Sequence, residues 1–169
     1  NGGDASDVAS VASFFVSRVE TAVDNALEKK GNTELLGKIA VANSQVVYKR
    51  FKELFGDERW NKLADAGARV QRPLWASTST KNPQYPDTKY VDSLIGEHTV
   101  NTVPPNTLDA FTNNGTAALT IEDGLAEAEA ALSKLDEIGI DLGQITQDLQ
   151  DAGVASFAKS FESLMGSIA

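Results

Sequence analysis

Three apolar stretches of the sequence are typical of core strands, and a positive charge follows each of the first two. The first stretch covers residues 8–17 and leads to Arg18, and the second covers residues 73–79 and leads to Lys81. The third covers residues 98–103 and stops at two prolines, which cannot continue a strand ladder. Strands buried on both faces lose the alternation of apolar and polar residues, so these stretches indicate a parallel sheet. We therefore predict three parallel strands that are adjacent in chain order.

The two cations fall at the ends of the first two predicted strands. Because parallel strands point the same way, their carboxyl ends lie on one rim, and α/β proteins bind their ligands there. Arg18 and Lys81 are both expected at this rim. The sequence therefore predicts an anionic small-molecule site.

Charge and composition exclude several other classes of protein. Residues 1–105 carry 13 acids and 13 bases, whereas residues 106–169 carry 11 acids against Lys134 and Lys159. A nucleic-acid binder shows a clustered basic face instead, so that class is excluded. The absence of Cys excludes thiolate nucleophiles and Cys-ligated zinc, and a single His gives no expected metal site. No apolar run approaches the ~20 residues of a membrane-spanning helix, so no membrane contact is expected.

The ends of the sequence suggest a piece of something larger. A length of 169 residues suits one domain. However, the chain begins at Asn1 and its one methionine is Met165. We therefore expect a processed, excised or truncated piece.

Helical patterns fill the rest of the chain. We expect helices over residues 19–30, 33–55, 57–66, 90–95, 106–113, 121–135, 141–152 and 157–168. Asp57 is expected to cap the third of these, and Gly67 to follow its end in a left-handed conformation. Asp141 with Gln144 resembles a capping box, and Gly153 is expected to end the helix before it.

Strands alternating with helices imply right-handed crossovers and a parallel sheet with helices outside. Three strands are nevertheless too few for a closed (β/α)8 barrel, which has eight strands in roughly 250 residues. The predicted fold class is therefore α/β, a part of a TIM barrel.

Several long, nearly uninterrupted motifs resemble those of transaldolases. They are residues 11–20 (VASFFVSRVE), 37–43 (GKIAVAN), 71–83 (QRPLWASTSTKNP), 85–91 (YPDTKYV) and 98–104 (HTVNTVP). The resemblance is to the longer bacterial and plastid-type branch of the family. It covers essentially the whole chain.

This resemblance implies an enzyme of the pentose phosphate pathway, in the cytoplasm or, in a photosynthetic eukaryote, the plastid stroma. Such enzymes transfer a dihydroxyacetone unit among sedoheptulose 7-phosphate, glyceraldehyde 3-phosphate, fructose 6-phosphate and erythrose 4-phosphate. They act through a Schiff base on a lysine, without a metal or organic cofactor. The motifs match the last three barrel strands, so residues 1–169 correspond to the C-terminal portion. The Schiff-base lysine is expected outside this chain, in an N-terminal half that is another polypeptide or another segment.

The resemblance also assigns residues to the phosphate end of the site. Arg18 matches the family's phosphate-binding arginine, Ser13 a serine near the substrate, and Phe15 an aromatic residue that packs over the pocket. Ser77 matches a second serine on the phosphate side. One family branch has an arginine just after that serine, and the nearest base here is Lys81.

The two cations have alternative interpretations. Arg18 could instead pair with Glu20 or Asp24 on the following helix. Lys81 could be a solvated loop residue, or the Schiff-base nucleophile itself if desolvation or a nearby cation lowered its pKa. The polar Asn82-Pro83 turn that follows Lys81 argues against that last role.

Other residues with reactive side chains have simpler roles. Ser13 and Ser77 lack the Gly-x-Ser-x-Gly elbow of serine hydrolases, and His98 is expected at the opposite end of its strand. The amphipathic stretch 121–135 could cover the barrel or form an oligomer contact.

At the level of the whole chain, two hypotheses remain: the C-terminal part of a transaldolase, or a non-catalytic phosphate-binding or packing module that has lost the lysine-bearing half.

Overall fold

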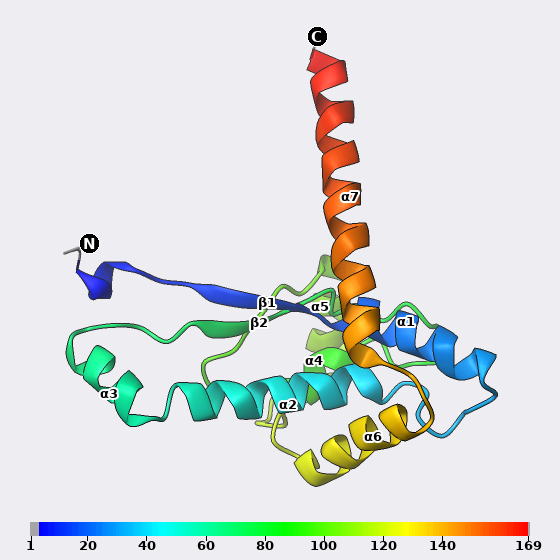
Figure 1. Cartoon of the computed structure of the whole chain (residues 1–169), viewed down its shortest axis with the longest axis horizontal. Coiled ribbons are helices and arrows are strands. Elements are labelled where there is room, and N and C mark those ends of the chain that lie inside the picture. Colours follow the sequence, from blue (N-terminus) through cyan, green and yellow to red (C-terminus); the bar gives the residue numbers. More distant parts are fainter. Residues whose placement is uncertain (1–3, 169) are drawn as a thin grey trace.

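A computed structural model of the chain describes residues 4–168 and contains a sheet of three parallel strands (Figure 1). The strands are β1 (Val11–Phe15), β2 (Arg72–Ala76) and β3 (Val100–Asn101), adjacent in that order. Leu74 of β2 pairs with Ser13 of β1. The predicted parallel order is confirmed, and the fold class is α/β.

Helices make up most of the remaining chain. They are a short 3-10 turn (Ala5–Asp7), α1 (Val16–Lys29), α2 (Ile39–Leu54), α3 (Glu58–Asp65), α4 (Lys89–Ser93), α5 (Pro105–Asn114), α6 (Leu125–Glu137) and α7 (Leu142–Ile168). Figure 1 shows α6 outside α2 and α7 projecting away from the other elements. Because α6 packs against α2, stretch 121–135 covers the helical layer. Within residues 4–168, no helix is both long and apolar enough to cross a lipid bilayer.

All three strands are shorter than predicted. Strand β1 ends at Phe15 and α1 begins at Val16, so Arg18 lies in the first turn of a helix rather than at the end of a strand. Strand β2 ends before Ser77, whose φ of 56° is left-handed and breaks the ladder. His98 has a φ of 58° and precedes β3, at the end opposite the rim, as expected.

Some of the predicted helix boundaries are wrong and others are correct. Helix α7 runs through Gly153, because one glycine costs only about 1 kcal/mol relative to alanine in a helix. Helix α2 begins at Ile39, later than expected. Gly67 has the predicted left-handed φ of 88°. The Asp141 carboxylate accepts the Gln144 main-chain N–H at 3.0 Å, which is half of a capping box.

One face of the sheet is buried under helices and the other is open. Trp75 is fully buried and donates from Nε1 to the Leu94 carbonyl at 3.1 Å. On the open face of β1, Val11 is 40% exposed and Phe15 is 44% exposed. The prediction that the strands are buried on both faces is therefore wrong for β1 within this chain. An apolar edge strand left open to water is a surface that normally binds another strand.

The cap of α3 allows a first test. The Asp57 carboxylate accepts the Trp60 main-chain N–H at 2.7 Å, as predicted. Asp57→Ala should remove about 1 kcal/mol of helix stability, so amide hydrogen exchange in α3 should accelerate roughly fivefold. Asp65→Ala, at the other end of the helix, is the control and should cause no loss of protection. Unchanged exchange in Asp57→Ala would show that this cap contributes nothing.

Candidate functional site

The carboxyl ends of the three strands lie on one rim, where the first turn of α1 meets the segment after β2. The Ser17 main-chain N–H donates to the Ser77 carbonyl at 3.0 Å and joins these two pieces. Next to Ser77, Thr78 is fully buried and its hydroxyl donates to the Asn101 side chain at 2.7 Å. The left-handed Ser77 is thus held by neighbours on both sides, as strained residues at functional sites usually are.

Arg18 is exposed at this rim and rests on an aromatic ring. Its guanidinium carbon lies 4.7 Å from the centre of the Phe15 ring, within the range of a cation–π contact. The two carboxylates of the alternative pairing are engaged elsewhere: Glu20 binds Lys89, and Asp24 accepts a hydrogen bond from the Tyr85 hydroxyl. Arg18 has no salt bridge within the described part of the chain. Its alternative pairing with Glu20 or Asp24 is therefore wrong.

Three of the five predicted site residues share one cavity. Ser13, Phe15 and Arg18 line a cavity of about 630 Å³ between β1, α1, α2 and α7. Ser77 does not line this cavity, although its carbonyl accepts the N–H of Ser17, the neighbour of Arg18 in α1. Lys81 is exposed and donates to the Ser79 hydroxyl at 2.8 Å. The structure thus groups the first three and leaves Lys81 apart.

Some polar residues of this cavity were not predicted. Asn43 of α2 contributes to the wall, as do Thr146 and Gln150 of α7. Asn43 could have been found, because it is the polar member of an otherwise apolar helical stripe. Nothing in the sequence indicated the α7 residues, since their approach depends on how a distant helix docks.

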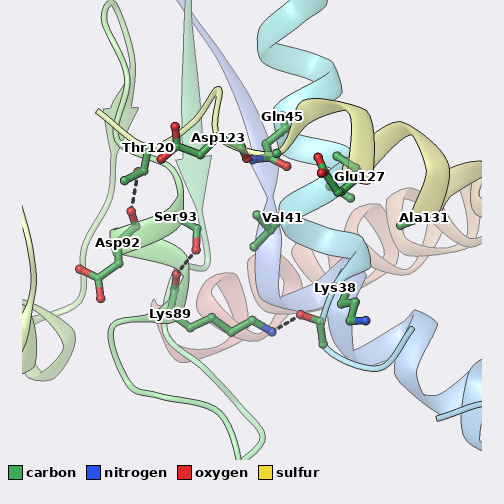
Figure 2. Close-up of a pocket in the computed structure, with 14 residues that line it drawn as sticks. Lys38, Val41, Gln45, Lys89, Asp92, Ser93, Thr120, Asp123, Glu127 and Ala131 are labelled. Carbon is green, nitrogen blue, oxygen red and sulfur yellow. Dashed lines mark hydrogen bonds between the residues drawn. The ribbon is translucent and has the colours of Figure 1, made fainter. Parts of the chain in front are cut away.

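A second cavity, of about 520 Å³, lies in the helical layer and shares no lining residue with the first. Figure 2 shows Lys38, Gln45 and Glu127 on one side of it and Asp92 and Thr120 on the other. Its polar groups connect elements of the fold. The side-chain amide of Gln45 donates to the Asp123 carbonyl at 2.7 Å, and the Thr120 hydroxyl donates to the Asp92 carbonyl. We assign no chemistry to this cavity.

Two tyrosines, the partly buried Tyr85 and the buried Tyr90, lie close to carboxylates of α1. Burial, followed by the hydrogen bond to Asp24, raises the pKa of Tyr85 well above its ordinary value. Burial, followed by the charge of Glu20, raises the pKa of Tyr90 in the same direction. Both phenols therefore stay protonated at neutral pH and act as hydrogen-bond donors.

A family model described as transaldolase/fructose-6-phosphate aldolase matches residues 3–168. The chain belongs to this family. It is 48% identical over 168 residues to a transaldolase of Mycolicibacterium smegmatis, with 97% of this chain and 45% of the relative covered. It is 47% identical over 171 residues to a transaldolase of Parafrankia, a match that covers 99% of this chain and 46% of the relative. It is 45% identical over 172 residues to a transaldolase of Thermobifida fusca, a match that covers 99% of this chain and 47% of the relative.

This transaldolase-family chain spans about half the length of the curated relatives that it matches. Together with three parallel strands in one sheet, this length fits the C-terminal part of a (β/α)8 barrel. Strand β1 is an edge strand paired with β2 on one side, which agrees with a sheet that continues beyond it.

Proposed function

We propose that residues 1–169 form the C-terminal part of a transaldolase barrel and supply the phosphate-binding end of its active site. We use the name complete barrel for this chain together with the strands that it lacks. The matched relatives are single longer chains, which favours a missing segment over a separate polypeptide. The enzyme would act in the pentose phosphate pathway, in the cytoplasm, on sugar phosphates.

One observation carries this proposal. Arg18 stands exposed on the rim beside Ser13 and Phe15, while the nearby carboxylates Glu20 and Asp24 are bound to other groups. A planar guanidinium offers parallel N–H donors that match two phosphate oxygens. Stacking on Phe15 holds this plane without neutralising its charge.

The residues around Arg18 have complementary roles in the proposal. The hydroxyls of Ser13 and Ser77 donate hydrogen bonds to the bound sugar phosphate, and Lys81 adds a second positive charge. Phe15 packs over the pocket. The covalent step, in which a lysine forms a Schiff base with the substrate carbonyl and releases water, takes place outside this chain. No metal or organic cofactor is required.

The activity itself is directly testable. With fructose 6-phosphate and erythrose 4-phosphate as substrates, the complete barrel should form sedoheptulose 7-phosphate and glyceraldehyde 3-phosphate. A coupled dehydrogenase assay measures the glyceraldehyde 3-phosphate that is formed. A complete barrel that is folded yet catalyses no such exchange would contradict the proposal.

Lys81 provides a graded test of the phosphate end. Because it is exposed, Lys81→Ala should raise the KM for sugar phosphates only about two- to fivefold, as expected for a screened surface charge. Lys62→Ala, which removes an exposed lysine of α3, is the matched control and should leave KM unchanged. If Lys81→Ala abolished turnover, Lys81 would have a role in the chemistry that we do not assign to it.

A further inference from the structure

A buried cluster of polar side chains joins α1 to the segment that follows β2. Lys89 extends its ammonium group to the Glu20 carboxylate at 2.7 Å, and the two side chains are 14% and 2% exposed. The same ammonium donates to the Gly37 carbonyl, the bond drawn beside Lys38 in Figure 2. It also lies 3.9 Å from the centre of the Tyr85 ring and 5.1 Å from that of Tyr90.

The other polar groups of the cluster are also paired. The second Glu20 oxygen accepts the Ala40 main-chain N–H at 3.1 Å, at the start of α2. Asp24 accepts the Gly37 N–H at 3.0 Å and the Tyr85 hydroxyl at 2.7 Å. Gly37 has a left-handed φ of 70°, and a Cβ there would lie 2.7 Å from the Tyr85 ring. These groups contact the Lys89 ammonium closely, while the Lys89 side chain also lines the second cavity.

The same two pieces of chain meet again at the rim. Helix α1 carries Arg18 two residues before Glu20 of the cluster, and the segment between β2 and α4 carries Ser77 and Lys81. At the rim they are joined by one main-chain bond, from Ser17 N–H to the Ser77 carbonyl. The Ser17 hydroxyl is buried and has no partner among the described residues, so it adds no further bond.

We propose that Lys89 is a positioning residue, which holds α1 and the segment 77–88 in the relative placement that lets Arg18 and Ser77 address one phosphate. This inference rests on the proposed function. Glu20 and Asp24 are both buried and four residues apart on one helix, where like charges repel, and Lys89 forms a salt bridge with Glu20. Removing that charge leaves the buried Glu20 carboxylate without its cation, which favours both protonation of Glu20 and a shift of these pieces away from each other.

The test uses the complete barrel and the variants Lys89→Met, Lys89→Arg and Leu135→Ala. Lys89→Met keeps the unbranched aliphatic part of the side chain but loses the ammonium group and its charge. We expect its KM for fructose 6-phosphate to rise about tenfold, because a small misplacement of binding groups is costly, with little change for unphosphorylated dihydroxyacetone. Lys89→Arg should restore most of the affinity. Leu135→Ala, buried in α6 and outside the cluster, should lower the melting temperature without changing KM.

If Lys89→Met raised KM no more than Leu135→Ala, or affected both substrates equally, the positioning role would be wrong. Arg18→Ala in the same assay separates this failure from that of the proposed function. A rise in KM with Arg18→Ala but not with Lys89→Met overturns only the inference. No rise with Arg18→Ala overturns the phosphate assignment itself.

Tyr85→Phe keeps the test decisive if Lys89→Met does not fold. It removes one hydroxyl and its bond to Asp24 while preserving the ring beside Lys89. We expect a two- to threefold rise in the KM for fructose 6-phosphate, as from one lost hydrogen bond of about 0.5 kcal/mol. An unchanged KM in this variant would overturn the proposal.

Discussion

The isolated 169-residue chain should associate into larger species and show no sharp thermal transition. The apolar residues Val11 and Phe15 of β1 are at least 40% exposed on an open sheet face. Along α7, the exposed apolar residues are Val154, Phe157, Phe161, Leu164, Met165 and Ile168. A soluble monomer rarely shows so much contiguous apolar surface, and an open strand edge pairs readily with another chain. Sedimentation velocity and calorimetry on the purified chain measure both properties.

The complete barrel serves as the control for this experiment. It should sediment as a compact species with a cooperative transition, because in our proposal further strands cover β1. A compact, stable monomer formed by the isolated chain would contradict our account and favour the non-catalytic module.

Replacing Arg18 by alanine in the complete barrel should lower kcat/KM for sugar phosphates by roughly 10- to 150-fold, the equivalent of a charged hydrogen bond worth about 1.5–3 kcal/mol. Arg18 would hold the phosphate in both the ground state and the transition state. Loss of such uniform binding raises KM more than it lowers kcat. Unphosphorylated dihydroxyacetone, which has no phosphate to lose, should be affected far less. Steady-state kinetics with both substrates provide the comparison.

Arg50→Ala is a matched control for this variant, since Arg50 is an exposed arginine of α2 that pairs only with Glu53 on the same helix. It should leave both substrates unaffected. Equal losses for phosphorylated and unphosphorylated substrates in Arg18→Ala would mean that Arg18 does not bind phosphate.

The apolar stretches predicted the order and direction of the strands, because burial of a sheet core depends on residues that are local in sequence. Their ends were less predictable. Val16 and Ser17 continue the apolar and small-residue pattern of β1, yet together with Arg18 they form the first turn of α1. Whether these residues form strand or helix depends on the Ser17–Ser77 contact, which joins residues far apart in the chain. Gly153 was over-weighted for a related reason, since one unfavourable residue does not end a helix that its neighbours support.

The residues of the candidate site could also be predicted only in part. Ser13, Phe15 and Arg18 lie within one short motif, so a single strand and turn bring them together. The cluster of Lys89 was not predicted, because its partners Glu20 and Gly37 lie on distant segments. In the sequence alone, Lys89 is one of several lysines in polar surroundings. Only the fold shows that its charge is buried and paired.

The most direct test of the central claim is to map the lysine that carries the substrate. The complete barrel is incubated with fructose 6-phosphate, reduced with borohydride, digested and examined by mass spectrometry. We expect a single labelled lysine outside residues 1–169, because none of the strands β1, β2 and β3 contains a lysine that could face a barrel interior. A label on Lys81, Lys89 or any other lysine of this chain, or no label at all, would contradict the account.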